Sequence, residues 1–356
     1  MTIAPRRWVA ALDPYVPGRP AGSEDGSLAS NESALGASPA VQAAIAAASA
    51  RVHRYPDPLA DEVRAALAAE LDVGADNILV GNGSDELVYL LVTAFAAMGG
   101  RAVCADPPYR IHDIVPRALG CQVTRVPLVK WAHDLEAMAR VEAELAFICN
   151  PHNPSGTTVG RAEIAHFLAG SKAGLAVVDE AYIDFADDPQ ATTALGLLPL
   201  GNVVVMRTFS KLHGLAGLRI GYLVGPRDVV ATLRKVRPPF SVNAVAQSAA
   251  LAALADHDHR ARVRAETLAA RDATAALFEE AGYRPVPSQA NFVLVRTPDA
   301  GKLADALALR GVSVRPGRAL GVADAVRVGV PSRSGLALLR QALAGIGGQA
   351  EATGAL

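Results

Sequence analysis

The stretch VVVMRTFSKLHGLAGLR, residues 203–219, carries the most specific pattern in the chain. Its first part, Val203–Met206, is a short apolar run rich in β-branched residues, which predicts a buried β-strand. Lys211 follows this strand, between Ser210 and a loop that contains two glycines. A lysine taken alone would most often be solvated, but open α/β sheets bind ligands beyond the carboxyl ends of their strands. Its position therefore makes Lys211 a candidate ligand-binding residue.

Polar or glycine-rich segments follow several other candidate strands in the same way. The strands with such segments are Ile78–Val80, Ala102–Ala105, Leu145–Cys149, Leu175–Val178 and Val203–Met206. The segments that follow them are residues 81–86, 106–109, 150–156, 179–182 and 207–211. A purely structural sheet does not need polar residues at every strand end. The pattern therefore predicts one crevice that these segments share.

Between Pro39 and about Val236, apolar strands alternate with helical stretches such as Asp85–Ala97. This βαβ alternation predicts an α/β fold with a mostly parallel sheet flanked by helices. After Pro238–Pro239, one long Ala-rich helical stretch over about Val245–Ala281 precedes shorter strands, which predicts a smaller α+β domain. We expect an N-terminal arm at residues 1–38 that joins the small domain or a dimer interface, a large domain at 39–238 and a small domain at 239–356.

The composition argues against several classes of protein. Of the 356 residues, 51% are hydrophobic and 19% are charged, which is typical of a well-buried globular chain of about two domains. The formal net charge of −1 provides no field that would attract nucleic acid or an anionic membrane, so we expect neither as a partner. The apolar runs are too short to span a bilayer, and residues 1–10 lack the apolar core of a signal peptide. Three cysteines without a Cys-x-x-Cys pair favour reduced core thiols and a cytoplasmic location.

Three further patterns have a structural interpretation as well as a functional one. Gly81-Asn82-Gly83 before a helix can hold a phosphate on backbone N–H groups, but it can also be a plain strand-to-helix turn. A dinucleotide fingerprint is incomplete there, because Glu86 stands where the third glycine belongs. Asp179 can act chemically or cap a helix. The run DHDHR at 256–260 follows an Ala-rich helix, which favours a solvated helix end over a metal site.

Taken together, the strand-end segments resemble the signatures of fold-type-I pyridoxal-phosphate (PLP) aminotransferases. The resemblance rests on NPSG at 153–156, DEAY at 179–182 and TFSKLHGLAGLR at 208–219. Additional matches, RYPD at 54–57, GNGSDE at 81–86, SQANF at 288–292 and VR at 314–315, point to the histidinol-phosphate aminotransferase group. The match runs in order from about Tyr15 to Val330, nearly the whole chain. It implies the fold of a fold-type-I PLP-transferase, with PLP bound in the large domain.

The resemblance implies a role toward the cofactor for each residue type at the strand ends. PLP acts as an electron sink, and the protein binds and tunes it. Lys211 would bind PLP as a Schiff base and later move the proton at the substrate α-carbon as general base and acid. Asp179 would keep the pyridine nitrogen protonated. Tyr182 and Asn153 would hydrogen-bond the 3-oxygen of the ring, and Tyr109 would stack on its face.

The same resemblance implies a binding site for the phosphate group of PLP. Its donors are the backbone N–H groups of Ser84 and Asp85 together with the side chains of Thr208, Ser210 and Arg219. Tyr55 would reach this phosphate from the other subunit, because members of the family place two active sites at the interface of a C2 homodimer.

The resemblance specifies the substrate end of the site less closely. Arg327 matches the arginine that binds the substrate α-carboxylate, a bidentate contact that lysine makes poorly. Arg315 and Tyr15 match positions at the side-chain end of the substrate pocket, although Arg315 could instead lie on the surface and Tyr15 could pack the arm. The chain departs from the family pattern at NESA (31–34), at VGVPS (328–332), at Ser155, and at His112, where many relatives carry an aromatic residue. These changes lie near the substrate, so they leave its identity open.

The expected function is transamination between histidinol phosphate and 2-oxoglutarate, with small-molecule amino donors and 2-oxo acids as the partners. An aromatic amino acid is an alternative donor, because related enzymes accept each. Decarboxylation of a phosphorylated amino acid is a second alternative, since the reaction depends on which bond of the α-carbon lies perpendicular to the cofactor ring. A ligand-sensing domain of a transcription regulator is disfavoured, because the arm before Tyr15 is too short for a DNA-binding domain.

Overall fold

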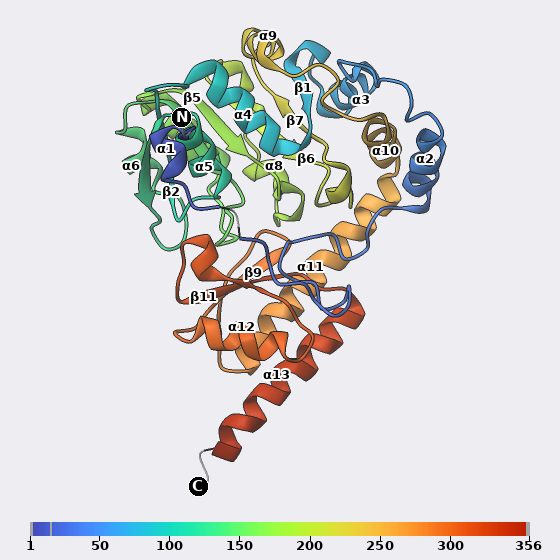
Figure 1. The fold of residues 1–356 in the computed structure, drawn as a ribbon, viewed down its shortest axis with the longest axis vertical. Coiled ribbons are helices and arrows are strands. Elements are labelled where there is room, and N and C mark those ends of the chain that lie inside the picture. Colours follow the sequence, from blue (N-terminus) through green and yellow to red (C-terminus); the bar gives the residue numbers. More distant parts are fainter. Residues whose placement is uncertain (1–2, 15, 354–356) are drawn as a thin grey trace.

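The computed structural model describes residues 3–14 and 16–353, which form a larger and a smaller layered unit (Figure 1). The larger unit is built on a seven-stranded sheet and the smaller one on a four-stranded sheet. The amino-terminal segment starts beside the larger unit at α1 (Arg7–Ala10), descends to the smaller unit and returns to α2 (Pro39–Ser49) (Figure 1). The chain therefore visits both units before the first strand begins.

The large sheet has the strand order β1-β7-β6-β5-β4-β2-β3. Its strands are β1 (Ile78–Gly81), β2 (Arg101–Asp106), β3 (Gln122–Pro127), β4 (Ala143–Cys149), β5 (Ala173–Asp179), β6 (Val203–Thr208) and β7 (Gly221–Val224). All neighbours pair in parallel except β7, which runs antiparallel to both β1 and β6. The predicted α/β fold with a mostly parallel sheet is therefore confirmed. β7 is not among the strands that the sequence pattern predicts.

Both faces of this sheet are buried, as expected for a parallel sheet with helices on each side. On one face, Phe147 and Val177 pack in a core with α4 (Gly83–Phe95), α5 (Ile111–Ala118) and α9 (Arg227–Val236). On the other face, Ile148 and Val178 pack against α6 (Leu135–Ala139) and α7 (Arg161–Gly170). Near β1 and β7 this second face is covered by α2, α3 (Asp61–Leu71) and α10 (Ala244–Ala255). The carboxyl ends of the strands are therefore a place where a ligand can bind without displacing the core.

The smaller unit is an antiparallel sheet with the order β10-β11-β9-β8. Its elements are β8 (Arg284–Val286), β9 (Phe292–Arg296), β10 (Arg315–Pro316), β11 (Ala325–Gly329), α11 (His257–Glu280), α12 (Ala300–Ala308) and α13 (Arg333–Thr353). The arm packs into this unit at Leu28, which donates its N–H to Ser313 O and accepts the N–H of Gly329. In the part of the chain that the structure describes, no helix is long and apolar enough to cross a membrane.

The expected single helix over residues 245–281 is wrong, because the chain forms two helices there, α10 and α11. They meet at Asp256, whose carboxylate accepts the N–H of His259 at 3.1 Å and so caps α11. α10 packs in one core with β1 and β7, whereas α11 contacts β8 and β9 of the small sheet. The predicted domain division near residue 238 stays a prediction, and the packing places α10 with the large sheet.

A buried ion pair ties the ends of β5 and β6 together. Glu180 directly follows β5, and its carboxylate accepts two hydrogen bonds from Arg207 at 3.0 and 2.8 Å. The hydroxyl of Thr193 donates a further bond to it at 2.9 Å. Because Asp179 precedes Glu180 and Lys211 lies four residues after Arg207, the pair helps to position both candidate residues.

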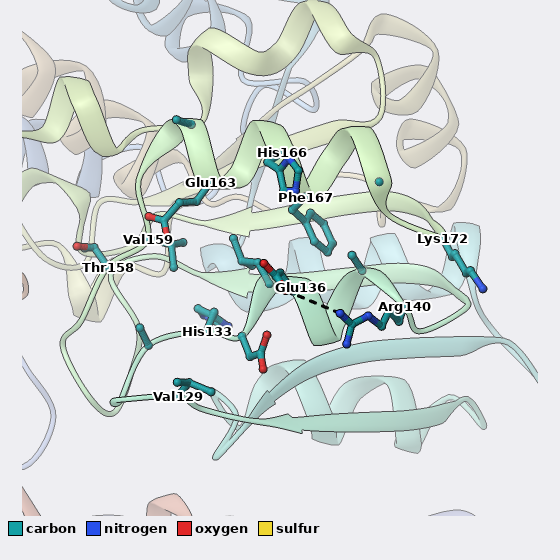
Figure 2. A pocket seen from close by; sticks show the side chains of 16 residues that line it. Val129, His133, Glu136, Arg140, Thr158, Val159, Glu163, His166, Phe167 and Lys172 are labelled. Atoms are coloured by element: carbon teal, nitrogen blue, oxygen red, sulfur yellow. Dashed lines mark ion pairs between the residues drawn. The ribbon is translucent and has the colours of Figure 1, made fainter.

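We predict that Glu180→Gln lowers the free energy of unfolding by about 3 kcal/mol, because it leaves the charge of Arg207 uncompensated. The Arg207 side chain is 17% exposed, which keeps the loss at the lower end of the range for buried pairs. The matched control is Glu136→Gln, which breaks the surface ion pair with Arg140 (Figure 2) and should cost less than about 0.5 kcal/mol. Urea denaturation of both variants measures the difference. Equal losses in the two variants would contradict the role given to the buried pair.

Candidate active site

A cavity of about 490 Å³ lies between the unit of the seven-stranded sheet, the unit of the four-stranded sheet and the amino-terminal segment. Residues that follow the carboxyl ends of β4, β5 and β6 line it, as do residues from the start of α4 and from the small sheet. The predicted site residues among its lining are Asp85, Tyr109, Asn153, Tyr182, Lys211, Arg315 and Arg327. The structure therefore brings together side chains that lie more than 200 residues apart in the sequence.

A larger cavity of about 980 Å³ lies between α6 and α7 of the large domain (Figure 2). None of the predicted site residues lines it. Phe167 points into it from α7, while the charged side chains of Glu163, Arg140 and Lys172 are exposed at its rim. Size alone would favour this cavity, but convergent polar groups with altered pKa values are the better mark of a catalytic site. The smaller cavity has them.

The side chain of Lys211 lies in the smaller cavity, against the arm. Its ammonium donates to Asn31 O at 3.1 Å and to Ser30 O at 3.3 Å, and lies 5.5 Å from the centre of the Tyr182 ring. Burial, with a smaller contribution from the positive charge of Arg327, lowers the pKa of Lys211 to about 8. The neutral amine, which is the nucleophilic form, is therefore far more populated near neutral pH than in a solvated lysine.

Asp179 is the last residue of β5 and is only 1% exposed. Its Oδ2 lies 3.1 Å from Nε2 of His112, and its Oδ1 accepts the N–H of Ala181 at 3.1 Å. His112 is buried as well and stacks on Phe147, with ring centroids 4.8 Å apart. The orientation of the Asp179 carboxylate is therefore set from both sides.

His112 is a residue that the sequence marks only as a departure from the family, not as a partner of Asp179. A usable signal is its spacing, because it follows Tyr109 by three residues and the turn that leads into α5 joins them, with the N–H of His112 donating to Tyr109 O at 2.9 Å. The two rings meet edge to face with centroids 5.1 Å apart. The helix-cap interpretation of Asp179 is wrong, since the helical turn that follows, η2 (Ile183–Phe185), has Tyr182 at its N-cap.

The hydroxyl of Tyr182 is a junction between three segments of the chain. It accepts hydrogen bonds from the side-chain amides of Asn153 at 3.1 Å and Asn31 at 3.3 Å. Arg327 of β11 donates to Oδ1 of Asn153 at 2.8 Å and to Ala29 O at 2.7 Å. Burial raises the pKa of Tyr182 to about 12, although the charge of Arg327 opposes the shift. One polar network therefore joins the large domain, the small domain and the arm.

The pairing of β7 with β1 and β6 brings the predicted phosphate-binding residues together at the start of α4. Gly221 of β7 pairs with Thr208 on one side and with the last residue of β1 on the other. A Cβ atom on Gly221 would lie 2.8 Å from the backbone nitrogen of Ser84. A Cβ atom on Gly83, which has a φ of +76°, would lie 2.7 Å from Nη2 of Arg219. The two glycines therefore leave a cradle that any larger residue would fill.

The donors around this cradle suit a tetrahedral anion. Thr208 donates its hydroxyl to Ser210 Oγ at 2.9 Å, and Arg219 Nη2 lies 3.5 Å from Asp85 Oδ2. Burial raises the pKa of Asp85, although the charge of Arg219 opposes it. A helix N-terminus, two hydroxyls and a guanidinium are the donor set that phosphate prefers. The residues present therefore fit the phosphate of the implied cofactor.

Three further residues are predicted to belong to the site, and the structure treats each of them differently. Tyr55 does not line the cavity, since its side chain is 83% exposed and stacks on Phe240 with ring centroids 4.7 Å apart. Arg315 is buried and donates to Val16 O at 2.5 Å, so the alternative that it lies on the surface is wrong. Tyr15 lies outside the described residues.

The cavity also contains polar residues that the sequence does not single out as site residues. They are Asp13, Ser30, Asn31, Tyr89 and Arg110. Asn31 has a left-handed backbone with a φ of 55°, and its carbonyl accepts the bond from Lys211. The described residues include no group of three or more His, Cys, Asp or Glu side chains that could hold a metal ion.

Curated relatives align with nearly the whole chain. The histidinol-phosphate aminotransferase of Symbiobacterium thermophilum is 42% identical over 341 residues, which cover 91% of this chain and 93% of that protein. The aromatic amino acid aminotransferase of Thermobifida fusca is 38% identical over 330 residues, covering 90% of this chain and 91% of the relative.

The fold also matches solved structures. The crystal structure of histidinol-phosphate aminotransferase from Sinorhizobium meliloti, in complex with pyridoxal-5'-phosphate, superposes with a TM-score of 0.87. It is 27% identical, and the match covers 96% of this chain and 97% of that one. The family model described as aminotransferase class I and II matches residues 26–346. The chain therefore belongs to the aminotransferase class I and II family.

Proposed function

We propose that this protein is a PLP-dependent aminotransferase that transfers the amino group of histidinol phosphate to 2-oxoglutarate. The observation that carries the choice of substrate is a pair of buried arginines, Arg315 and Arg327, which are register partners on β10 and β11 and both line the cavity. Relatives named for histidinol phosphate, at 36–42% identity, support the same donor. The closely related aromatic enzymes support the general reaction.

PLP, when bound, supplies an electron sink that stabilises negative charge at the substrate α-carbon. In our proposal Asp179 holds a proton on the ring nitrogen, and His112 keeps that carboxylate in position. Tyr182 and Asn153 would hold the 3-oxygen by hydrogen bonds, and Tyr109 would support the ring. Burial of these groups excludes water, which strengthens each of their electrostatic contacts.

Lys211 has two tasks in the proposal, covalent attachment of the cofactor and movement of the proton at the substrate α-carbon. Both tasks need an amine that is readily neutral near pH 7, and a pKa of about 8 meets that need. The carbonyl oxygens of Ser30 and Asn31 hold the ammonium form in place. The lysine can therefore accept and return a proton without leaving the cavity.

The phosphate group of PLP is assigned to the cradle at the start of α4. The backbone N–H groups of Ser84 and Asp85, the hydroxyls of Thr208 and Ser210, and the guanidinium of Arg219 are the proposed donors. Gly83 and Gly221 permit the close approach, because a side chain at either position would occupy the space beside these donors.

The substrate end of the site is assigned to Arg327 and Arg315, with Tyr15 as a further lining residue. An amino acid carries its carboxylate directly on the α-carbon, whereas histidinol phosphate carries its anion beyond a methylene and an ester oxygen. Two neighbouring guanidiniums can bind an anion at either distance from the α-carbon. An enzyme that accepts both an amino acid and histidinol phosphate requires this. An aromatic amino acid has a carboxylate but no second anionic group, so one of the two arginines would have no anion to bind. The aromatic alternative therefore explains less of the site.

Half-reactions of the PLP-loaded enzyme with single amino donors test this proposal. Histidinol phosphate should convert the bound cofactor to its amine form with a kcat/KM at least about 30-fold above phenylalanine, because a charge-assisted bond contributes about 2 kcal/mol. Tyrosine and aspartate are the further comparison donors. Faster conversion by phenylalanine or tyrosine would favour the aromatic alternative, and release of CO₂ in place of an oxo product would favour decarboxylation.

The lowered pKa of Lys211 predicts a pH dependence for covalent capture of PLP by the apoenzyme. The rate should rise with pH through a midpoint near 8, because only the neutral amine reacts. In Arg327→Met the midpoint should move up toward 10.5, since removing a nearby positive charge stabilises the ammonium form. Borohydride reduction at timed intervals and mass spectrometry of the Lys211 peptide measure the rate. Arg140→Met is the distant control, and a midpoint that does not respond to Arg327→Met would contradict the explanation.

We also propose that the active form is a homodimer in which Tyr55 of one subunit contacts the cofactor phosphate of the other. The support is an exposed aromatic pair, Tyr55 and Phe240, whose rings stack on each other. Val52 and Leu59, close to Tyr55 in the sequence, and Val236, close to Phe240, are exposed apolar side chains as well. Exposed apolar clusters of this kind are typical of interaction surfaces.

Tyr55→Phe tests this proposal, because it keeps the ring and removes only the hydroxyl. We expect the variant to remain a dimer in analytical ultracentrifugation and to bind PLP about tenfold more weakly, as for one lost hydrogen bond. Tyr283→Phe, in the small domain, is the control and should bind PLP normally. A wild-type protein that sediments as a monomer, or an unchanged PLP affinity in Tyr55→Phe, would overturn the assignment.

A further inference from the structure

Arg110 lies in the cavity directly after Tyr109, and neither the family signatures nor the sequence pattern assigns it a role. It is partly buried at the start of α5 and lines the cavity together with Arg315. Its Nη1 donates to Ala319 O at 2.9 Å. Ala319 belongs to η5 (Gly317–Leu320) of the small domain, so Arg110 reaches across from one domain to the other.

The acceptor of Arg110 lies close in the sequence to the strand that carries Arg315. Ala319 follows Arg315 by only four residues, and Arg315 is the register partner of Arg327. Arg110 therefore contacts the segment that directly follows the strand of Arg315. Arg110, which precedes α5, lines one cavity with Arg315 of β10 and Arg327 of β11.

The charge balance of this volume is unusual. Its lining contains four cationic side chains, Lys211, Arg110, Arg315 and Arg327, against the carboxylates of Asp13 and Asp85. Asp85 lies 3.5 Å from Arg219 at the phosphate cradle, which leaves it little capacity to offset the arginines. Among the described residues, Arg110 forms no ion pair with a carboxylate, and its recorded acceptor is a neutral carbonyl. Among the described residues that line the cavity, cationic side chains therefore outnumber carboxylates.

The number of arginines distinguishes between kinds of anion. A carboxylate carries one negative charge and two acceptor oxygens, which one guanidinium can satisfy in a bidentate contact. A phosphate monoester carries a charge of about −1.5 to −2 near pH 7 and three acceptor oxygens, so it needs a second guanidinium. One guanidinium can therefore serve the carboxylate of an amino acid, whereas the phosphate ester calls for two.

We propose that Arg110 is a specificity-determining residue that forms, with Arg315, a subsite for the dianionic phosphate ester of the amino donor. The inference rests on the proposed function and adds the substrate class to it, because the subsite favours phosphorylated over unphosphorylated donors. Since the two arginines belong to different domains, a phosphate bound between them also bridges the domains.

Kinetics of Arg110→Gln with a matched pair of donors, histidinol phosphate and histidinol, test the proposal. In the variant holoenzyme, kcat/KM for histidinol phosphate should fall about 30-fold, mostly through KM, as for loss of one charge-assisted contact. The value for histidinol should change by less than about twofold, since it has no phosphate to lose. Arg110→Lys, which keeps the charge but not the bidentate geometry, should recover part of the loss.

The pH profile separates a contact with phosphate from a structural role. KM of the wild type for histidinol phosphate should fall as pH rises through about 6, where a phosphate ester loses its second proton. That dependence should flatten in Arg110→Gln. The control is Arg117→Gln, on the same helix but paired with Asp113 at 3.0 Å outside the cavity, and it should behave as the wild type. Equal losses of kcat/KM for histidinol and histidinol phosphate in Arg110→Gln would overturn the proposal.

Failure of the proposed function can be told apart from failure of this inference. If the wild type does not transaminate histidinol phosphate, calorimetric titration of the holoenzyme with inorganic phosphate still reports on the subsite. Weaker phosphate binding by Arg110→Gln than by wild type and Arg117→Gln would support the subsite without the substrate. Equal binding by all three proteins would overturn it.

Discussion

The in-register pairing of β4, β5 and β6 is the constraint on which the rest of the site depends. It sets Cys149 beside Asp179 and Asp179 beside Met206 at the carboxyl ends of three parallel strands. The chain needs only a few residues beyond each strand to present Asn153, Tyr182 and Lys211 to one volume. Because both faces of the sheet are buried under helices, these strand ends are where polar groups can gather without displacing the core.

The second constraint is the contact between the domains. Arg327 of β11 reaches Asn153 in the large domain, and the same arginine holds Ala29 of the arm. The arm in turn supplies the carbonyl groups that hold Lys211. Lys211 and Arg327 are thus both held by the arm, a segment that belongs to neither sheet. The cavity is a product of all three parts of the chain.

Burial and charge act together in this cavity. Burial of Lys211, with a smaller contribution from the positive charge of Arg327, lowers its pKa, which suits it to proton transfer. The same burial would make the arginines costly without partners, and carbonyl and amide oxygens satisfy part of their hydrogen-bonding capacity. A carbonyl or amide oxygen carries no net charge, so these particular contacts do not neutralise the guanidiniums.

The sequence by itself determined the class of fold and the residues that follow each strand, because strand periodicity and strand-end polarity are local properties. It therefore identified Lys211, Asp179, Tyr182 and Asn153, as well as the glycines that open α4. It missed the division into α10 and α11, since one side-chain cap at Asp256 interrupts an otherwise continuous helical pattern.

Only the tertiary structure decided which distant residues meet. His112 behind Asp179, Asn31 against Lys211 and Arg110 beside the small domain are contacts between residues 67 to 209 positions apart. No local pattern encodes such separations, because they depend on how the arm and the small sheet pack on the large one. The sequence specified the groups that we propose to bind the cofactor, and the packing of three segments decided which other residues line the same cavity.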